Sequence, residues 1–105
     1  MKESYVAMKA QMFNYEQWIE EIDPELLKKK LHELLLASGF TVLNHTEHYF
    51  PVQGYTCVWL LGESHLAIHT FPQSQRSFLQ LSSCNEEKLD FLKKRLPSVL
   101  NTMAN

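Results

Sequence analysis

The chain contains 105 residues, of which 45% are hydrophobic and 21% are charged, as expected of a single soluble domain spanning residues 1–105. The formal net charge of −2 disfavours a nucleic-acid partner, and no apolar run reaches the roughly 18 residues that a membrane span requires. The N-terminal residues lack the apolar core of a signal peptide, so we expect a cytoplasmic protein that does not bind membranes.

Five strands and two helices are predicted along the chain. The first helix begins at Asp23 and Pro24, which supply a side-chain cap and a proline at the first helical position, and it ends at Gly39. The second helix begins near Glu86, and Pro97 is expected to end or kink it. Strands are predicted at residues 4–12, 40–45, 55–61, 65–71 and 77–83.

This order of elements predicts an α+β fold, in which an antiparallel sheet of four to five strands carries two helices on one face. Leucines spaced along one side of each helix predict the buried layer between the helices and the sheet: Leu27, Leu31, Leu34, Leu35, Leu89, Leu92 and Leu96. The other face of so apolar a sheet would be exposed in a single chain. We therefore expect a homodimer in which two sheets stack as an αββα sandwich.

The stretch GESHLAIHTFPQ, residues 62–73, is unusually rich in reactive side chains for a strand. If the connection after this strand is centred on residue 74, an antiparallel hairpin places Ser64 opposite Cys84. Strict alternation places His69 on the face opposite Ser64, unless the chain bends near Gly62. The sequence thus predicts that a serine and a distant cysteine are neighbours.

Other interpretations of this stretch are less favourable. It lacks the final glycine of a nucleophile elbow, and His65 and His69 would lie about 13 Å apart along a strand, too far to share a metal ion. No zinc-binding spacing is found, so we expect no metal. Cys57 lies in the apolar run YTCVWLL and is expected to be a small buried side chain.

The segment ESHLAIHTFPQ, followed by Cys84 fifteen residues after His69, resembles the bacterial and archaeal S-adenosylmethionine decarboxylases. Their motif reads E-S-H-L-x-I-H-T-W-P-E. The resemblance runs without gaps from about Phe50 to Cys84, and DPELLKKKLHELLLASGFTVL is similar to the family's first helix and following strand. These enzymes are self-cleaving, pyruvoyl-dependent lyases of polyamine biosynthesis, with spermidine as a product of the pathway.

The resemblance implies that the Ser64 hydroxyl attacks the carbonyl of Glu63 and that the chain then breaks between these two residues. His69 matches the residue that serves this step, and Thr56 matches a serine that supports it. Hydrolysis then leaves a pyruvoyl cofactor derived from Ser64, which binds the substrate amine as a Schiff base. Cys84 matches the proton donor that completes the decarboxylation.

The resemblance also implies how an amino-acid-like substrate is held. Phe50 matches an aromatic residue that stacks on adenine, and Gln73 stands where the family has a glutamate that binds the ribose hydroxyls. Cys57 and Asn85 replace glycines, Gln80 replaces an aspartate, and the usual N-terminal G-x-H segment is absent.

Three functions follow as expectations from the motif and its departures. The first is decarboxylation of S-adenosylmethionine, because Phe50 and the cleavage motif are kept. The second is decarboxylation of ornithine or arginine, because the loss of a ribose-binding carboxylate at Gln73 suits a smaller substrate. The third is a regulatory homologue that is never cleaved and that pairs with an active paralogue.

Overall fold

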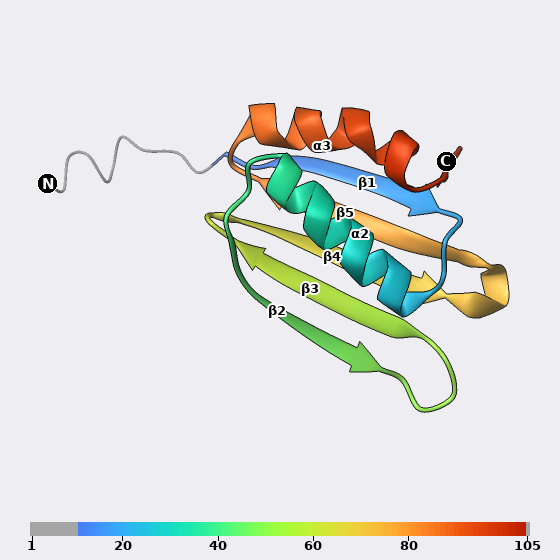
Figure 1. Cartoon of the computed structure of the whole chain (residues 1–105). Helices are drawn as coiled ribbons and strands as arrows, with labels where there is room; N and C mark the ends of the chain where they lie inside the picture. Colours follow the sequence, from blue (N-terminus) through green and yellow to red (C-terminus); the bar gives the residue numbers. More distant parts are fainter. Residues whose placement is uncertain (1–10, 105) are drawn as a thin grey trace, which may run out of the picture.

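The structure is a computed structural model and describes residues 11–104. Six antiparallel strands form one sheet in the order β2-β3-β4-β5-β1-β6, and two helices lie on one of its faces (Figure 1). The strands are β1 (Phe13–Ile19), β2 (Val42–Tyr49), β3 (Tyr55–Leu61), β4 (Ser64–Phe71), β5 (Arg76–Ser83) and β6 (Thr102–Met103). The helices are α2 (Pro24–Ala37) and α3 (Glu86–Val99), with a 3-10 turn, η1, at Pro72–Ser74.

The predicted fold class is confirmed, but the sheet has six strands rather than four to five. Most of the strand predicted at residues 4–12 lies outside the described residues, and residues 11 and 12 are not in a strand. The strand in this part of the chain is β1, which pairs with β5 from Phe13 to Ile19. β6 is only two residues long, so it has no alternation from which it could be predicted.

The start of α2 is as predicted. The Asp23 side chain accepts a hydrogen bond from the backbone N–H of Leu26 at 2.9 Å, and Pro24 occupies the first helical position. At the other end Gly39 adopts a left-handed conformation with φ of +88°, which stops the helix. The cap and the glycine thus fix the length of a helix whose leucines face the sheet.

The helix α3 does not end at Pro97, as the sequence had indicated it could, but continues to Val99. Proline removes the amide that would bond to the carbonyl of residue 93, one turn earlier. Lys93 is exposed, so water can satisfy that carbonyl. Helical bonding continues beyond the proline, since the Leu100 N–H donates to the Leu96 carbonyl at 2.9 Å.

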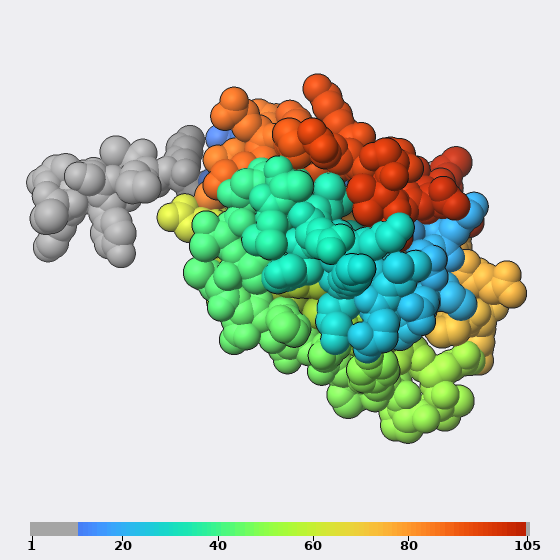
Figure 2. Space-filling model, viewed as in Figure 1, coloured from blue at the N-terminus to red at the C-terminus, as the bar shows by residue number. Residues whose placement is uncertain are grey.

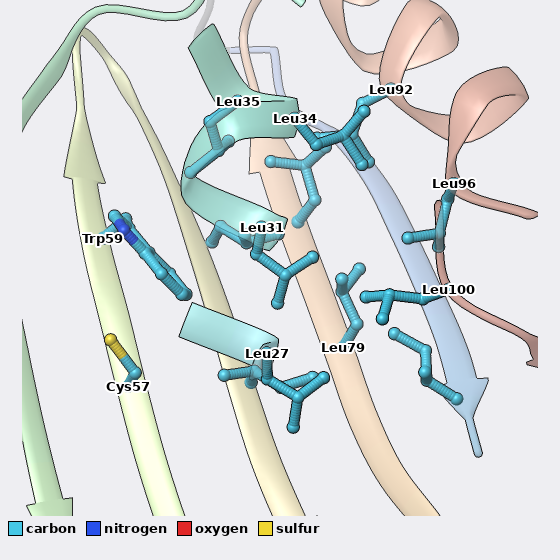
Figure 3. Close-up of a cluster of buried hydrophobic side chains, with 14 of the residues drawn as sticks. Leu27, Leu31, Leu34, Leu35, Cys57, Trp59, Leu79, Leu92, Leu96 and Leu100 are labelled. Atoms are coloured by element: carbon cyan, nitrogen blue, oxygen red, sulfur yellow. The ribbon is translucent and has the colours of Figure 1, made fainter. Parts of the chain in front are cut away.

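The core lies between the helices and the sheet (Figure 3). Alternate residues of β3 point toward the helices, and Cys57 and Trp59 are fully buried there. Cys57 is therefore the buried small side chain that we expected. The leucines of α2 and α3 form the other side of this core, and Figure 3 labels Leu27, Leu31, Leu34, Leu35, Leu92 and Leu96 together with Leu79 and Leu100.

The helices cover one face of the sheet, and we call the other face the open face. Apolar side chains remain accessible on it, with Leu60 53% exposed and Phe71 45% exposed. Trp18 and Phe78 lie on the same face with their rings in contact, 4.7 Å between centroids. None of the helices within residues 11–104 is long and apolar enough to cross a membrane.

Candidate active site

The Glu63–Ser64 bond lies at a tight hairpin turn between β3 and β4. Leu61 and Ser64 pair directly, so Gly62 and Glu63 alone make the turn. Glu63 has φ of +58°, a left-handed conformation that is uncommon for a residue with a side chain. Figure 2 shows this turn, in yellow, protruding at the left of the molecule beside the start of α3, in orange. The bond thus joins an exposed residue in a strained conformation to the first residue of β4.

Ser64 begins β4 and points to the helix-covered side of the sheet, where it is only 5% exposed. Its hydroxyl donates to the Ser83 hydroxyl at 2.9 Å. Ser83 in turn accepts from the backbone N–H of Asn85 at 2.9 Å. The serine expected to attack therefore has a fixed partner, which the sequence did not identify.

The register of the β4–β5 hairpin differs by one residue from the prediction, because Ser64 lies opposite Ser83 and not Cys84. The predicted register took residues 72–76 as the connection, whereas Arg76 already belongs to β5 and pairs with Phe71. A connection of residues 72–75 shifts every opposed pair by one position. Cys84 lies just beyond the end of β5.

Cys84 nevertheless lies next to the cleavage motif. Its Sγ donates a hydrogen bond to Oε1 of Glu63 at 3.3 Å, and both residues are exposed. The hydrogen bond to this carboxylate raises the pKa of the Cys84 thiol. Cys84 therefore lies close to the cleavage bond, as expected. It does so because it contacts the Glu63 side chain, and not because it is directly opposite Ser64.

His69 lies on the open face, as alternation predicted, and it contacts Thr56. The Thr56 Oγ1 and the His69 Nδ1 are 3.0 Å apart, and the two residues are directly opposed on β3 and β4. β4 is a regular strand from Ser64 to Phe71, so no bend brings the imidazole back to Ser64. Five residues of extended strand separate them by roughly 17 Å.

Phe50 and Gln73 lie at the end of the sheet away from the β3–β4 turn, in the connections at the right of Figure 1. Phe50 is 48% exposed, and the His48 ring meets it edge-on with centroids 4.7 Å apart. Gln73 is exposed and lines a cavity of about 450 Å³ together with Val52 and Phe71. The cavity thus joins the β2–β3 and β4–β5 connections.

The predicted site residues therefore fall into two groups. The cleavage group is Glu63, Ser64 and Cys84 at the β3–β4 turn. The distal group is Phe50, Thr56, His69 and Gln73 toward the other end. Within one chain the structure does not bring the two groups together.

The residues that differ from the family motif each fit their surroundings in the structure. Cys57 occupies a core position, where burial raises the pKa of its thiol. Gln80 lies on the open face and its Nε2 donates to Oε2 of Glu16 at 3.0 Å. Asn85 caps α3, since its Oδ1 accepts from the Lys88 N–H at 3.0 Å. A side chain in place of glycine is thus accommodated at both Cys57 and Asn85.

The fold and the site together define a narrow class of proteins. Its members are antiparallel α+β domains that have a Glu-Ser pair at a strained hairpin and a thiol beside that pair. The family model described as S-adenosylmethionine decarboxylase matches residues 10–102. The chain therefore belongs to the S-adenosylmethionine decarboxylase family.

Individual relatives agree with this assignment. The S-adenosylmethionine decarboxylase proenzyme of Brevibacillus brevis is 44% identical over 64 residues, which is 61% of this chain and 48% of that protein. The corresponding proenzyme of Thermosipho melanesiensis is 32% identical over 79 residues, 70% of this chain and 61% of that protein. The chain thus spans about half the length of the curated relatives it matches.

A solved structure supports the fold. The crystal structure of the adenosylmethionine decarboxylase from Aquifex aeolicus superposes with a TM-score of 0.74 and covers 92% of this chain and 86% of that one. The sequence identity is 18%, so the likeness establishes the shared fold alone.

Proposed function

We propose that the chain is a proenzyme that cleaves itself between Glu63 and Ser64 and then decarboxylates S-adenosylmethionine through a pyruvoyl group. Membership of the family supports this proposal. The observation that carries it is the Glu63–Ser64 bond at a left-handed turn, with the Ser64 hydroxyl hydrogen-bonded and the Cys84 thiol nearby. The left-handed residue stores about 1–3 kcal/mol of backbone strain, which cleavage releases.

In the first step, Oγ of Ser64 attacks the carbonyl carbon of Glu63. The C–N bond breaks as an ester C–O bond forms, and the hydroxyl proton passes to the released amine. A base then takes the α-proton of residue 64 and the bond between Cβ and Oγ of that residue breaks, so that Glu63 leaves with a terminal carboxylate. Water hydrolyses the remaining enamine with loss of ammonia.

The surroundings of Ser64 fit a pyruvoyl group at this position. The group would supply an electron sink for the loss of CO₂. The Ser83 hydroxyl, which accepts from Ser64 before cleavage, is equally able to donate to a carbonyl oxygen. The neighbouring Glu63 carboxylate raises the pKa of the Cys84 thiol, so the thiol keeps its proton. We assign Cys84 the role of donating this proton to the product carbon.

We assign the proton-abstracting role to His69 and a supporting role to Thr56. When Nδ1 of His69 carries hydrogen and donates to Thr56 Oγ1, Nε2 is left free to take a proton. Within one chain this imidazole is roughly 17 Å along β4 from Ser64. The assignment therefore requires a second copy of the chain.

We accordingly propose a homodimer in which two open faces stack in opposite directions, as an αββα sandwich. The distal group of each protomer then approaches the cleavage group of its partner. The accessible apolar side chains of the open face, including Leu60, Phe71 and Trp18, favour burial of this face. Each single-domain protomer would thus contribute to two sites.

The distal group would also bind the substrate. The accessible ring of Phe50 offers a surface on which adenine can stack, which favours S-adenosylmethionine. The Gln73 amide can hydrogen-bond hydroxyl groups but offers no carboxylate, which favours ornithine or arginine as the second candidate. We propose a cytoplasmic location, because the free thiols Cys57 and Cys84 suit a reducing compartment.

The proposal is tested by the intact mass of freshly purified, denatured protein. We expect two fragments that separate after Glu63, the second beginning with a pyruvoyl group, and we expect Ser64→Ala to remain whole. Release of CO₂ from S-adenosylmethionine, ornithine and arginine then identifies the substrate. A chain that stays whole after long incubation would refute self-cleavage and favour the regulatory homologue.

A further inference from the structure

The side chain of Glu63 has no part in the cleavage chemistry proposed above, which uses only its backbone carbonyl. Yet this carboxylate accepts the hydrogen of the Cys84 thiol, with Sγ and Oε1 3.3 Å apart. We propose that Glu63 is a positioning residue for Cys84, holding the thiol protonated and against the turn that bears residue 64. This inference rests on the proposed function, in which Cys84 donates a proton.

The backbone at Glu63 gives a first reason to assign its side chain a role. At φ of +58° a glycine would be free of strain, whereas a glutamate is conformationally disfavoured. Gly62, its neighbour in the same turn, is not left-handed. The residue with a long side chain therefore occupies the position that suits glycine, and its carboxylate accepts the hydrogen bond of the Cys84 thiol.

The charges around Cys84 give a second reason. A cysteine that acts as a nucleophile is usually activated by a nearby cation, which favours the thiolate. Here the thiol donates to the Glu63 carboxylate, from the β3–β4 turn, and this hydrogen bond raises the pKa of the thiol. Lys88, from the first turns of α3, opposes it more weakly. The balance favours a thiol that keeps its proton, as an acid must.

The position of the contact gives a third reason. Cys84 lies beyond the last pair of β5, where strand pairing no longer holds it. The hydrogen bond to Glu63 is what links its side chain to the turn beside Ser64. Removing the acceptor would therefore both lower the pKa of the thiol and release its side chain.

The test measures alkylation of Cys84 by iodoacetamide as a function of pH, in the Ser64→Ala background so that every chain is whole. Peptide masses assign the modification, and Cys57 serves as an internal control because it is fully buried. We expect Glu63→Gln to move the rate profile to lower pH and to raise the rate at pH 8 by roughly three- to tenfold. Glu63→Asp keeps the carboxylate but shortens the side chain by one methylene, so the rate profile should shift less.

The matched control is Glu87→Gln, which removes the same charge from an exposed residue at the start of α3. It should leave the profile nearly unchanged. Equal shifts in Glu63→Gln and Glu87→Gln, or no shift in either Glu63 variant, would overturn the inference. Because the chains are uncleavable, the result does not depend on self-processing, and failure of the wild-type chain to cleave would count against the proposed function alone.

Discussion

The two ends of the sheet differ in how their connections are built. At the β3–β4 turn, two residues reverse the chain, Glu63 is held in a left-handed conformation, and Ser64 is buried against Ser83. At the other end the connections are longer and open, Val52 is 92% exposed and Phe50 is half exposed. A tight turn suits a bond that must be strained and broken, whereas an open end with an accessible aromatic ring suits binding.

This contrast explains why the site that we propose needs two chains. The short turn holds the bond between Glu63 and Ser64, but the proposed base cannot reach this bond from the same chain, because Ser64 and His69 point to opposite faces of β4. The distal group contains the proposed base and the proposed binding residues, but it lacks the bond that is to be cleaved. The two ends are complementary, and stacking two copies in opposite directions would bring them together.

The largest effect is expected from His69→Ala, which removes the proposed base from the distal group. The rate of appearance of the two fragments should fall by about 10²–10⁴-fold, the usual contribution of general base catalysis. Timed intact-mass measurements of newly synthesised chain provide this rate. His65→Ala is the matched control on the same face, and a similar loss in both variants would contradict the assignment.

A second large effect is expected from Leu60→Glu, which introduces a charge on the open face. The substituted chains should sediment as monomers and should cleave slowly, because neither distal group can reach a cleavage group. Leu36→Glu on the outer side of α2 is matched, since both leucines are 53% exposed. A dimeric Leu60→Glu chain that cleaves at the normal rate would place the interface elsewhere.

Much of the fold could be predicted, because its signals are local. The cap at Asp23, the leucines of α2 and the apolar run 55–61 each determine an element without help from distant residues. The register of β4 and β5 could not be fixed in this way, since it depends on whether Arg76 pairs with Phe71 or belongs to the connection. That choice also decided whether Ser83 or Cys84 lies opposite Ser64.

The division of the site was predictable in part. Successive antiparallel strands place residues 50–54 and 72–75 at one end of the sheet and residues 62–63 at the other, so Phe50 and Gln73 had to lie far from Ser64. The contact of Glu63 with Cys84 was not predictable, because it depends on side chains beyond the paired residues.

A moderate effect is expected from Ser83→Ala, which removes the partner of the Ser64 hydroxyl. We expect cleavage to slow by about tenfold, since a hydrogen bond that orients the nucleophile contributes roughly 1–1.5 kcal/mol. Ser82→Ala, on the other face of β5, should have little effect. Thermal unfolding of both variants is needed beside the mass measurement, because Ser83 also accepts from the Asn85 N–H. An unchanged rate in Ser83→Ala would remove this residue from the site.

The smallest effect is expected from Gln73→Glu, in the distal group. The carboxylate should improve kcat/KM for S-adenosylmethionine relative to ornithine by roughly three- to tenfold, because hydrogen bonds to a charged acceptor are stronger. The rate of self-cleavage should not change, since Gln73 contacts neither Glu63 nor Ser64. A change in cleavage without a change in substrate preference would contradict the assignment of Gln73 to binding.

The most direct test of the shared site combines two variants in one dimer. Differently tagged Ser64→Ala and His69→Ala chains are produced together, mixed dimers are purified through both tags, and each chain is weighed. We predict that, in the time that the wild-type chain needs to be cleaved, neither variant is cleaved alone but the His69→Ala chain is cleaved in the mixed dimer, where its partner supplies His69. A His69→Ala chain that stays whole in the mixed dimer would contradict a site shared between protomers.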